Sequence, residues 1–138
     1  MAIAILDTSI YIDHWERGLY QDTLENVRRA YIIRHSAVVL SELRHGARGH
    51  EAERLIANLF ELATIRWEPS VADWWDAGRL VRSIGDKQDW DIHKRRDFQN
   101  DALIALTARR HSATVVTTNS SDFDLLRSEA RISVLAAR

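Results

Sequence analysis

Acidic residues stand within or just beyond several apolar runs of this sequence. They are Asp7 after Ala-Ile-Ala-Ile-Leu, Glu42 after Ala-Val-Val-Leu-Ser, Asp101 within Asn-Asp-Ala-Leu-Ile-Ala, and Asp122 shortly after Ala-Thr-Val-Val. Acids at the ends of buried strands tend to converge, and two carboxylates about 4 Å apart repel each other by roughly 4 kcal/mol at an effective dielectric near 20. A bound cation removes this repulsion, so the pattern predicts a divalent-metal site.

The residue types favour a hard metal ion at such a site. Magnesium and manganese prefer oxygen ligands and keep several waters. The sequence has no cysteine, which excludes disulfides and thiolate zinc sites, and its six histidines show no His-x-x-x-His pair. A metal-bound water loses a proton readily and can attack phosphorus, while a second ion about 3.5–4 Å away would hold the leaving oxygen. The sequence leaves open whether one ion or two would bind.

Length and composition are those of one soluble globular domain over residues 1–138. The chain is 46% hydrophobic and 28% charged, with a net charge of −1 from 19 basic and 20 acidic residues. A protein that coats nucleic acid by charge alone would be basic, so any contact with nucleic acid must use a local basic patch or a metal ion. The apolar runs are too short for a membrane span, and the N-terminus lacks the features of a signal peptide, so we expect a cytoplasmic protein.

Strand-like and helix-like segments alternate along the chain. We expect strands at 2–6, 36–40, 63–67, 113–117 and 132–135. We expect helices from Thr8 or Ser9 to 15, over 21–33, from a Ser41 cap onward, over 51–62, from Ser70 to 84, over 98–110 and over 120–127, with a loop at 85–96. This alternation predicts a three-layer α/β/α sandwich with a mainly parallel sheet, in which ligands bind beyond the carboxyl ends of the strands.

Four motifs occur in an order that resembles a known family. They are Leu-Asp-Thr-Ser at 6–9, Leu-Ser-Glu-Leu-Arg-His-Gly-Ala at 40–47, Asn-Asp-Ala-Leu-Ile-Ala-Leu-Thr-Ala at 100–108 and Val-Val-Thr-Thr-Asn-Ser-Ser-Asp-Phe at 115–123. Their order and spacing resemble those of PIN-domain ribonucleases, and most of all the VapC-type toxins of bacterial and archaeal toxin–antitoxin pairs. The resemblance covers nearly the whole chain.

The resemblance implies roles for the acids. Asp7 and Asp101 would hold the metal, and Glu42 would complete the acidic pocket. Asp101 lies inside an expected helix, where aspartate has poor propensity, which favours a functional reason for it. Many relatives carry a further acid where this sequence has Asn119. Either Asn119 offers a carbonyl oxygen or orients a water, or Asp122 supplies the missing charge.

Other residues are candidates for supporting roles. The resemblance implies that Thr8 and Ser9 hold Asp7 and touch the scissile phosphate. Arg44, on the same expected helix as Glu42, would balance the acids or meet phosphate. The basic run 94–96 is either an RNA contact or a solvated loop.

Two functions remain in competition. The first is a Mg²⁺- or Mn²⁺-dependent endoribonuclease toxin that cleaves single-stranded regions of RNA, forms a homodimer and is inhibited by a cognate antitoxin protein. The second is a PIN-like module that has lost catalysis and only binds RNA or protein, which Asn119 favours. A receiver-type phosphoacceptor is disfavoured, because that family needs two adjacent acids after the first strand and this sequence has only Asp7 there. The RNA target stays open.

Overall fold

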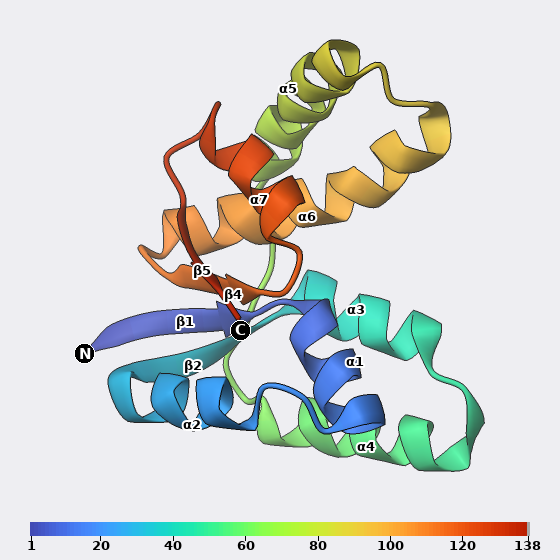
Figure 1. Cartoon of the computed structure of the whole chain (residues 1–138), viewed down its shortest axis with the longest axis vertical. Helices are drawn as coiled ribbons and strands as arrows, with labels where there is room; N and C mark the ends of the chain where they lie inside the picture. Colours follow the sequence, from blue (N-terminus) through green and yellow to red (C-terminus); the bar gives the residue numbers. More distant parts are fainter. Residues whose placement is uncertain (138) are drawn as a thin grey trace.

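A five-stranded parallel sheet lies between two layers of helices in the computed structural model, which describes residues 1–137 (Figure 1). The strands are β1 (Ala2–Leu6), β2 (Tyr31–Ser36), β3 (Arg66–Trp67), β4 (Thr114–Thr117) and β5 (Ser133–Ala136). Their order in the sheet is β3-β2-β1-β4-β5, and every pairing is parallel. This arrangement confirms the predicted α/β/α class.

The described residues form seven helices. They are α1 (Thr8–Arg17), α2 (Gln21–Ala30), α3 (Ala37–Gly46), α4 (Gly49–Leu62), α5 (Val71–Gln88), α6 (Ile92–Arg110) and α7 (Ser120–Arg127). In Figure 1, α5, α6 and α7 lie above the sheet, α1, α2 and α4 lie below it, and α3 extends to its right. Within residues 1–137, none of these helices combines the length and the apolar character needed to cross a bilayer.

The central strand β1 is buried on both faces. Its side chains alternate between the faces, so Ala4 and Leu6 pack in one cluster with Ile10 of α1, while Ile5 packs in a larger cluster with Phe98 of α6. Ala4, Ile5, Ile10 and Phe98 are all 0% exposed. Burial of this strand fixes the position of the residue that follows it, Asp7.

The second strand lies earlier than the sequence predicts. Residues 31–36 form β2, so the expected strand at 36–40 is wrong, and the expected helix over 21–33 ends at Ala30. The Ser36 hydroxyl accepts the backbone N–H groups of Val38 (3.2 Å) and Val39 (3.4 Å), so Ser36 rather than Ser41 caps α3. The β-branched run after Ser36 suggested a strand, but it forms the first turn of a helix whose apolar face is buried.

The expected loop at 85–96 is also wrong. Helix α5 continues to Gln88 and α6 begins at Ile92, so only residues 89–91 connect them. Asp89 adopts the left-handed conformation (φ 55°), and the Asp91 carboxylate caps α6 by accepting the Lys94 N–H at 2.9 Å. This helical hairpin has a polar, solvated tip and so lacks apolar periodicity. Because α6 begins at Ile92, Lys94 lies on a rigid helical turn and not in a loop.

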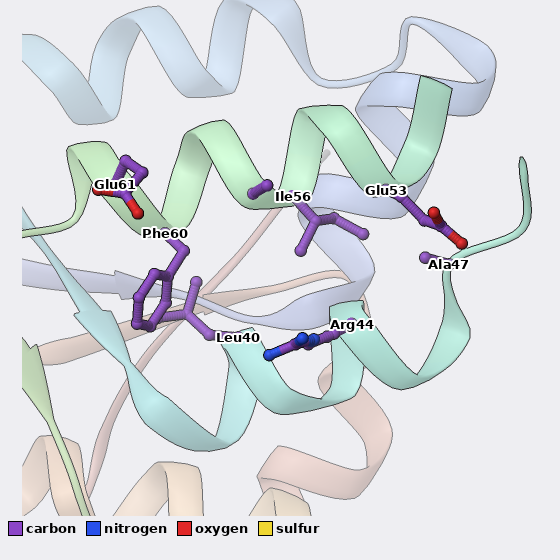
Figure 2. A pocket seen from close by; sticks show the side chains of 8 residues that line it. Leu40, Arg44, Ala47, Glu53, Ile56, Phe60 and Glu61 are labelled. Carbon is purple, nitrogen blue, oxygen red and sulfur yellow. The ribbon is translucent and has the colours of Figure 1, made fainter. Parts of the chain in front are cut away.

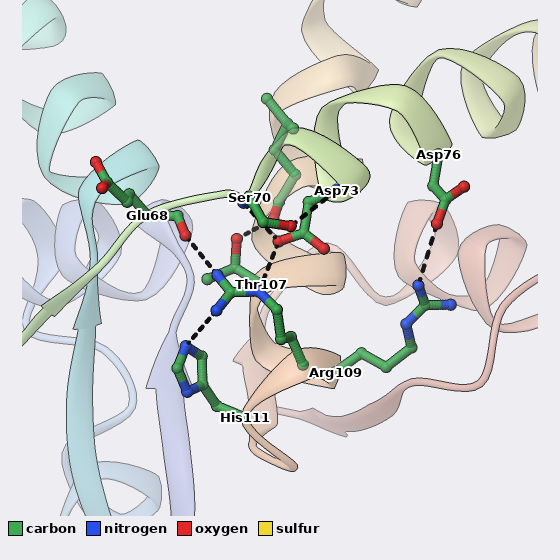
Figure 3. Close-up of polar contacts among 9 residues, drawn as sticks. Glu68, Ser70, Asp73, Asp76, Thr107, Arg109 and His111 are labelled. Atoms are coloured by element: carbon green, nitrogen blue, oxygen red, sulfur yellow. Dashed lines mark hydrogen bonds and ion pairs between the residues drawn. The ribbon is translucent and has the colours of Figure 1, made fainter.

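The far end of α6 is fixed by polar contacts (Figure 3). Arg110 donates to the buried carboxylate of Asp73 at 3.1 Å and also to the backbone oxygen of Glu68. Ser70 and Asp73 form a capping box at the start of α5, which confirms Ser70 as its cap. These contacts join α5 and α6 into one unit that carries Asp101.

Candidate active site

Asp7 is held at the carboxyl ends of two adjacent strands. Its backbone N–H donates to the Val116 oxygen at 2.8 Å and so extends the pairing of β1 with β4. One carboxylate oxygen, Oδ2, accepts hydrogen bonds from the hydroxyls of Thr117 (2.8 Å) and Ser9 (3.1 Å). Burial raises the pKa of Asp7, and the hydrogen bonds from Thr117, Thr8 and Ser9 oppose that rise. Asp7 is thus a rigid, buried carboxylate.

Glu42 connects three helices at the same place. Its Oε1 accepts the Thr8 hydroxyl at 2.7 Å, and its Oε2 accepts the Asn100 amide at 3.3 Å. Burial raises the pKa of Glu42, the bonds from Thr8 and Asn100 lower it, and the charges of Asp7 and Asp97 raise it further. Thr8 therefore contacts Glu42 through its side chain, whereas Ser9 contacts Asp7.

Asp101 is the most strongly perturbed acid. Burial raises the pKa of Asp101 to about 8, with further increases from the charges of Asp7, Glu42 and Asp122. Its carboxylate has no hydrogen bond or ion pair among residues 1–137, and only the charge of Lys94 favours its ionised form. The four predicted acids therefore share one electrostatic environment in which Asp101 lacks a partner.

The fourth acid faces this environment together with Asn119. Asp122 is 8% exposed, and its Oδ2 accepts both the Asn119 amide (3.0 Å) and the Lys94 ammonium (2.6 Å). The Asn119 backbone N–H donates to the Thr117 hydroxyl at 2.9 Å. Asn119 and Asp122 are thus connected by a hydrogen bond, and the choice between them as the fourth site residue stays a prediction.

Arg44 lies away from the acids. Residues two apart on a helix do not share a face, and Arg44 is two residues from Glu42. Its side chain lines a groove of about 490 Å³ between α3 and α4 (Figure 2). Among the described residues it makes no hydrogen bond or ion pair with an acid of the pocket. The groove is lined by Leu40, Arg44, Ala47, Glu53, Ile56, Ala57, Phe60 and Glu61.

Sequence reasoning missed three contacts in the pocket. Thr117 orients Asp7, Asn100 orients Glu42, and Lys94 pairs with Asp122. Thr117 and Asn100 lie inside the quoted motifs, so their positions beside the acids carried a signal. Lys94 lies outside those motifs, in the segment 85–96 that was expected to be a loop, so its pairing with Asp122 had no such signal.

The donor set fits a hard divalent ion. Carboxylate and amide oxygens are what Mg²⁺ and Mn²⁺ take, and a bound cation would offset the repulsion that Asp101 meets from Asp7, Glu42 and Asp122. No group of three or more His, Asp or Glu side chains within residues 1–137 is already arranged as a ligand set.

Comparison with known families agrees with this fold. The family model of the PIN domain matches residues 4–128, and the chain belongs to the PIN-domain family. Among curated proteins, none matches the chain.

Solved structures share the fold over nearly the full length. A chain of VapBC2 from Rickettsia felis, bound to a DNA fragment from their promoter, has a TM-score of 0.70 at 23% identity and covers 99% of both chains. VapBC-1 from nontypeable Haemophilus influenzae has a TM-score of 0.70 at 23% identity and covers 97% of both. VapBC-5 from Mycobacterium tuberculosis, a member of the VapBC family of toxin–antitoxin systems, has a TM-score of 0.57 at 23% identity and covers 100% of this chain and 99% of its own. Identities this low establish the fold alone.

Proposed function

We propose that this chain is a metal-dependent endoribonuclease and the toxin of a type II toxin–antitoxin pair of the VapC kind. The observation that carries the proposal is the shared pocket of Asp7, Glu42 and Asp101, in which hydroxyl and amide groups orient the first two and Asp101 has no partner. Membership of the PIN-domain family supports nuclease chemistry, and the VapBC structures of the same fold support the toxin assignment.

In this proposal Asp7 and Asp101 hold Mg²⁺ or Mn²⁺. When bound, the ion makes a water more acidic and offsets charge on the phosphate oxygens. Thr117 and Ser9 keep the Asp7 carboxylate in place, so it does not have to reorient during the reaction. Glu42 has a raised pKa and is held from both sides, which suits its carboxylate to accept a proton from the attacking water.

The proposed substrate is a single-stranded region of RNA. A net charge of −1 leaves recognition to local features of the surface rather than to overall charge. In the basic run at 94–96, Lys94 faces Asp122, Arg95 pairs with Asp86 at 2.9 Å, and Arg96 is exposed. Arg96 is thus the member of the run that is available for a phosphate of the RNA.

The proposed partners are a cognate antitoxin and a second copy of the chain, in the cytoplasm. The groove of Figure 2 has apolar walls from Leu40, Ile56 and Phe60, which suit an inserted antitoxin helix. The exposed Val71 (87%) and Trp75 (83%) at the start of α5 are apolar surface that a homodimer would cover.

The decisive experiment removes one ligand charge at a time. We expect Asp7→Asn and Asp101→Asn to abolish Mg²⁺-dependent cleavage of single-stranded RNA while the circular dichroism of the fold is retained. Asp124→Asn is the matched control, because Asp124 is an exposed acid of α7 that pairs with Arg127. Full cleavage by either pocket variant would refute the assignment.

A binding module without catalysis is the second candidate. The presence of Asn119 and the neutralisation of Asp122 by Lys94 favour it, since both reduce the charge available to a metal. Titration with Mn²⁺ separates the two functions. A binding module should show neither thermal stabilisation by Mn²⁺ nor cleavage, whereas a nuclease should show both.

A further inference from the structure

Lys94 places an ammonium group inside the acidic pocket. Its Nζ lies 2.6 Å from Oδ2 of Asp122, and its charge also acts on Asp101. The Asp122 side chain is 11% exposed and the Lys94 side chain is 39% exposed, so the ion pair is partly shielded from the screening that weakens fully exposed pairs. One edge of the pocket therefore already holds a positive charge, while the Asp7, Glu42 and Asp101 edge does not.

The position of Lys94 is fixed by the hairpin between α5 and α6. The backbone N–H of Lys94 donates to the carboxylate of Asp91, which caps α6. The Nζ of Lys94 lies 4.9 Å from the centre of the Trp90 ring. That ring packs edge-on against the buried Phe98, with 4.7 Å between centroids. The next residue, Arg95, binds both the Trp90 oxygen and Asp86 at 2.9 Å. The ammonium is thus presented to Asp122 by a supported turn.

The choice of lysine at this position is informative in an arginine-rich chain. Of the 19 basic residues, only Lys87 and Lys94 are lysines. An ammonium is a compact point charge, whereas a guanidinium is a planar fork that needs two aligned acceptors. A compact positive charge beside a carboxylate, like a metal ion, is balanced by the oxygen atoms around it.

We infer that the Lys94 ammonium is the second cation of the pocket and takes the role that a second divalent ion would have in a two-metal nuclease. The pocket then binds one divalent ion per chain, on the Asp7 and Asp101 side, and Asp122 serves Lys94 rather than a metal. This inference rests on the proposed function, and it resolves the choice between one and two ions that the sequence leaves open.

Calorimetric titration of Mn²⁺ into the metal-free full chain tests the inference. We expect the wild-type protein to bind one ion, and Lys94→Gln to bind a second ion because Asp122 becomes available. The double variant Lys94→Gln with Asp122→Asn should return to one ion. Lys87→Gln is the matched control, since Lys87 also pairs with a carboxylate, Glu129 at 3.5 Å, but outside the pocket.

Each outcome of these titrations either supports or overturns the inference about Lys94. Two ions in the wild-type protein, or one ion in Lys94→Gln at any affinity, would overturn the inference while the nuclease assignment stands. If the wild-type chain binds no Mn²⁺ and cleaves no RNA, the proposed function fails and the inference with it. Lys94→Arg should keep the count at one but weaken Mn²⁺ binding by about threefold or more, because the larger guanidinium crowds the pocket. The wild-type count remains a test even if a variant fails to fold.

Discussion

The hydroxyl of Thr8 donates a hydrogen bond to Oε1 of Glu42 at 2.7 Å, across 34 residues of sequence. This bond links the first turn of α1 to α3 and brings the first two motifs into one pocket. A hydrogen bond to a carboxylate favours its charged form, and Glu42 is otherwise pushed toward the neutral form by burial. Thr8 therefore opposes the rise in the pKa of Glu42 and also orients its carboxylate.

Replacement of Thr8 by valine tests this role. The change removes the hydroxyl at nearly constant shape, so the pKa of Glu42 should rise and the acidic limb of the rate–pH profile should move to higher pH. We expect cleavage near neutral pH to fall by about tenfold, which corresponds to about 1.4 kcal/mol. Thr8→Ser keeps the hydroxyl and should retain the wild-type profile. An unchanged profile in Thr8→Val would show that Glu42 does not depend on this bond.

Asp101 should make the metal-free protein sensitive to pH. Burial raises its pKa to about 8 in the folded state, above the ordinary value of 3.8, so the folded state binds a proton that the unfolded state releases. Stability is therefore greatest at low pH and is lost as the pH rises through the folded pKa. We expect the stability of Asp101→Asn not to fall in this way as the pH rises.

Thermal melts in a chelator measure this difference. Between about pH 5 and about pH 8, the wild-type melting temperature should fall by several degrees relative to that of Asp101→Asn. Added Mn²⁺ should restore the melting temperature of the wild-type protein at the higher pH and leave that of Asp101→Asn unchanged. Parallel pH dependences of the two proteins would contradict the assigned environment of Asp101.

Replacement of Asn119 by aspartate tests whether this position can carry a further acid of the pocket. The Asn119 amide donates to Asp122 at 3.0 Å, so Asn119→Asp replaces a hydrogen bond with repulsion between two carboxylates. Without metal, the variant should lose about 1–3 kcal/mol of unfolding free energy. With the extra charge, it should bind Mn²⁺ more tightly. Asn119→Ala separates the two effects, because it removes the donor and adds no charge.

Arg44 provides a test of where RNA approaches. Because Arg44 faces the groove between α3 and α4 rather than the acids, Arg44→Gln should change the cleavage rate by less than about twofold. The same variant should weaken binding of an antitoxin helix if the groove is its docking site. A loss of cleavage of about tenfold or more would instead place RNA along this groove.

Local patterns were sufficient to predict much of this protein. The apolar run 2–6, the capping serine at Ser70 and the helix at 120–127 were all predicted from short stretches of sequence, and the structure confirms them. Residue type and spacing marked Asp7, Glu42 and Asp101 as candidate site residues, and the structure places them in one electrostatic environment. The same local reasoning failed at 36–40 and 85–96, where a β-branched run and a polar run resemble a strand and a loop.

The contacts that give the pocket its chemistry depend on the tertiary structure. Thr117 reaches Asp7 across 110 residues, and Lys94 reaches Asp122 across 28. No local preference encodes such distances, because they depend on which strands become neighbours in the sheet and on how α6 is docked. The sequence alone thus determined the acids and the class of fold. Packing decided that Asp7 and Glu42 accept hydrogen bonds from hydroxyl groups and that Asp122 pairs with a lysine. It also decided that Asp101 has no hydrogen-bond partner among the described residues.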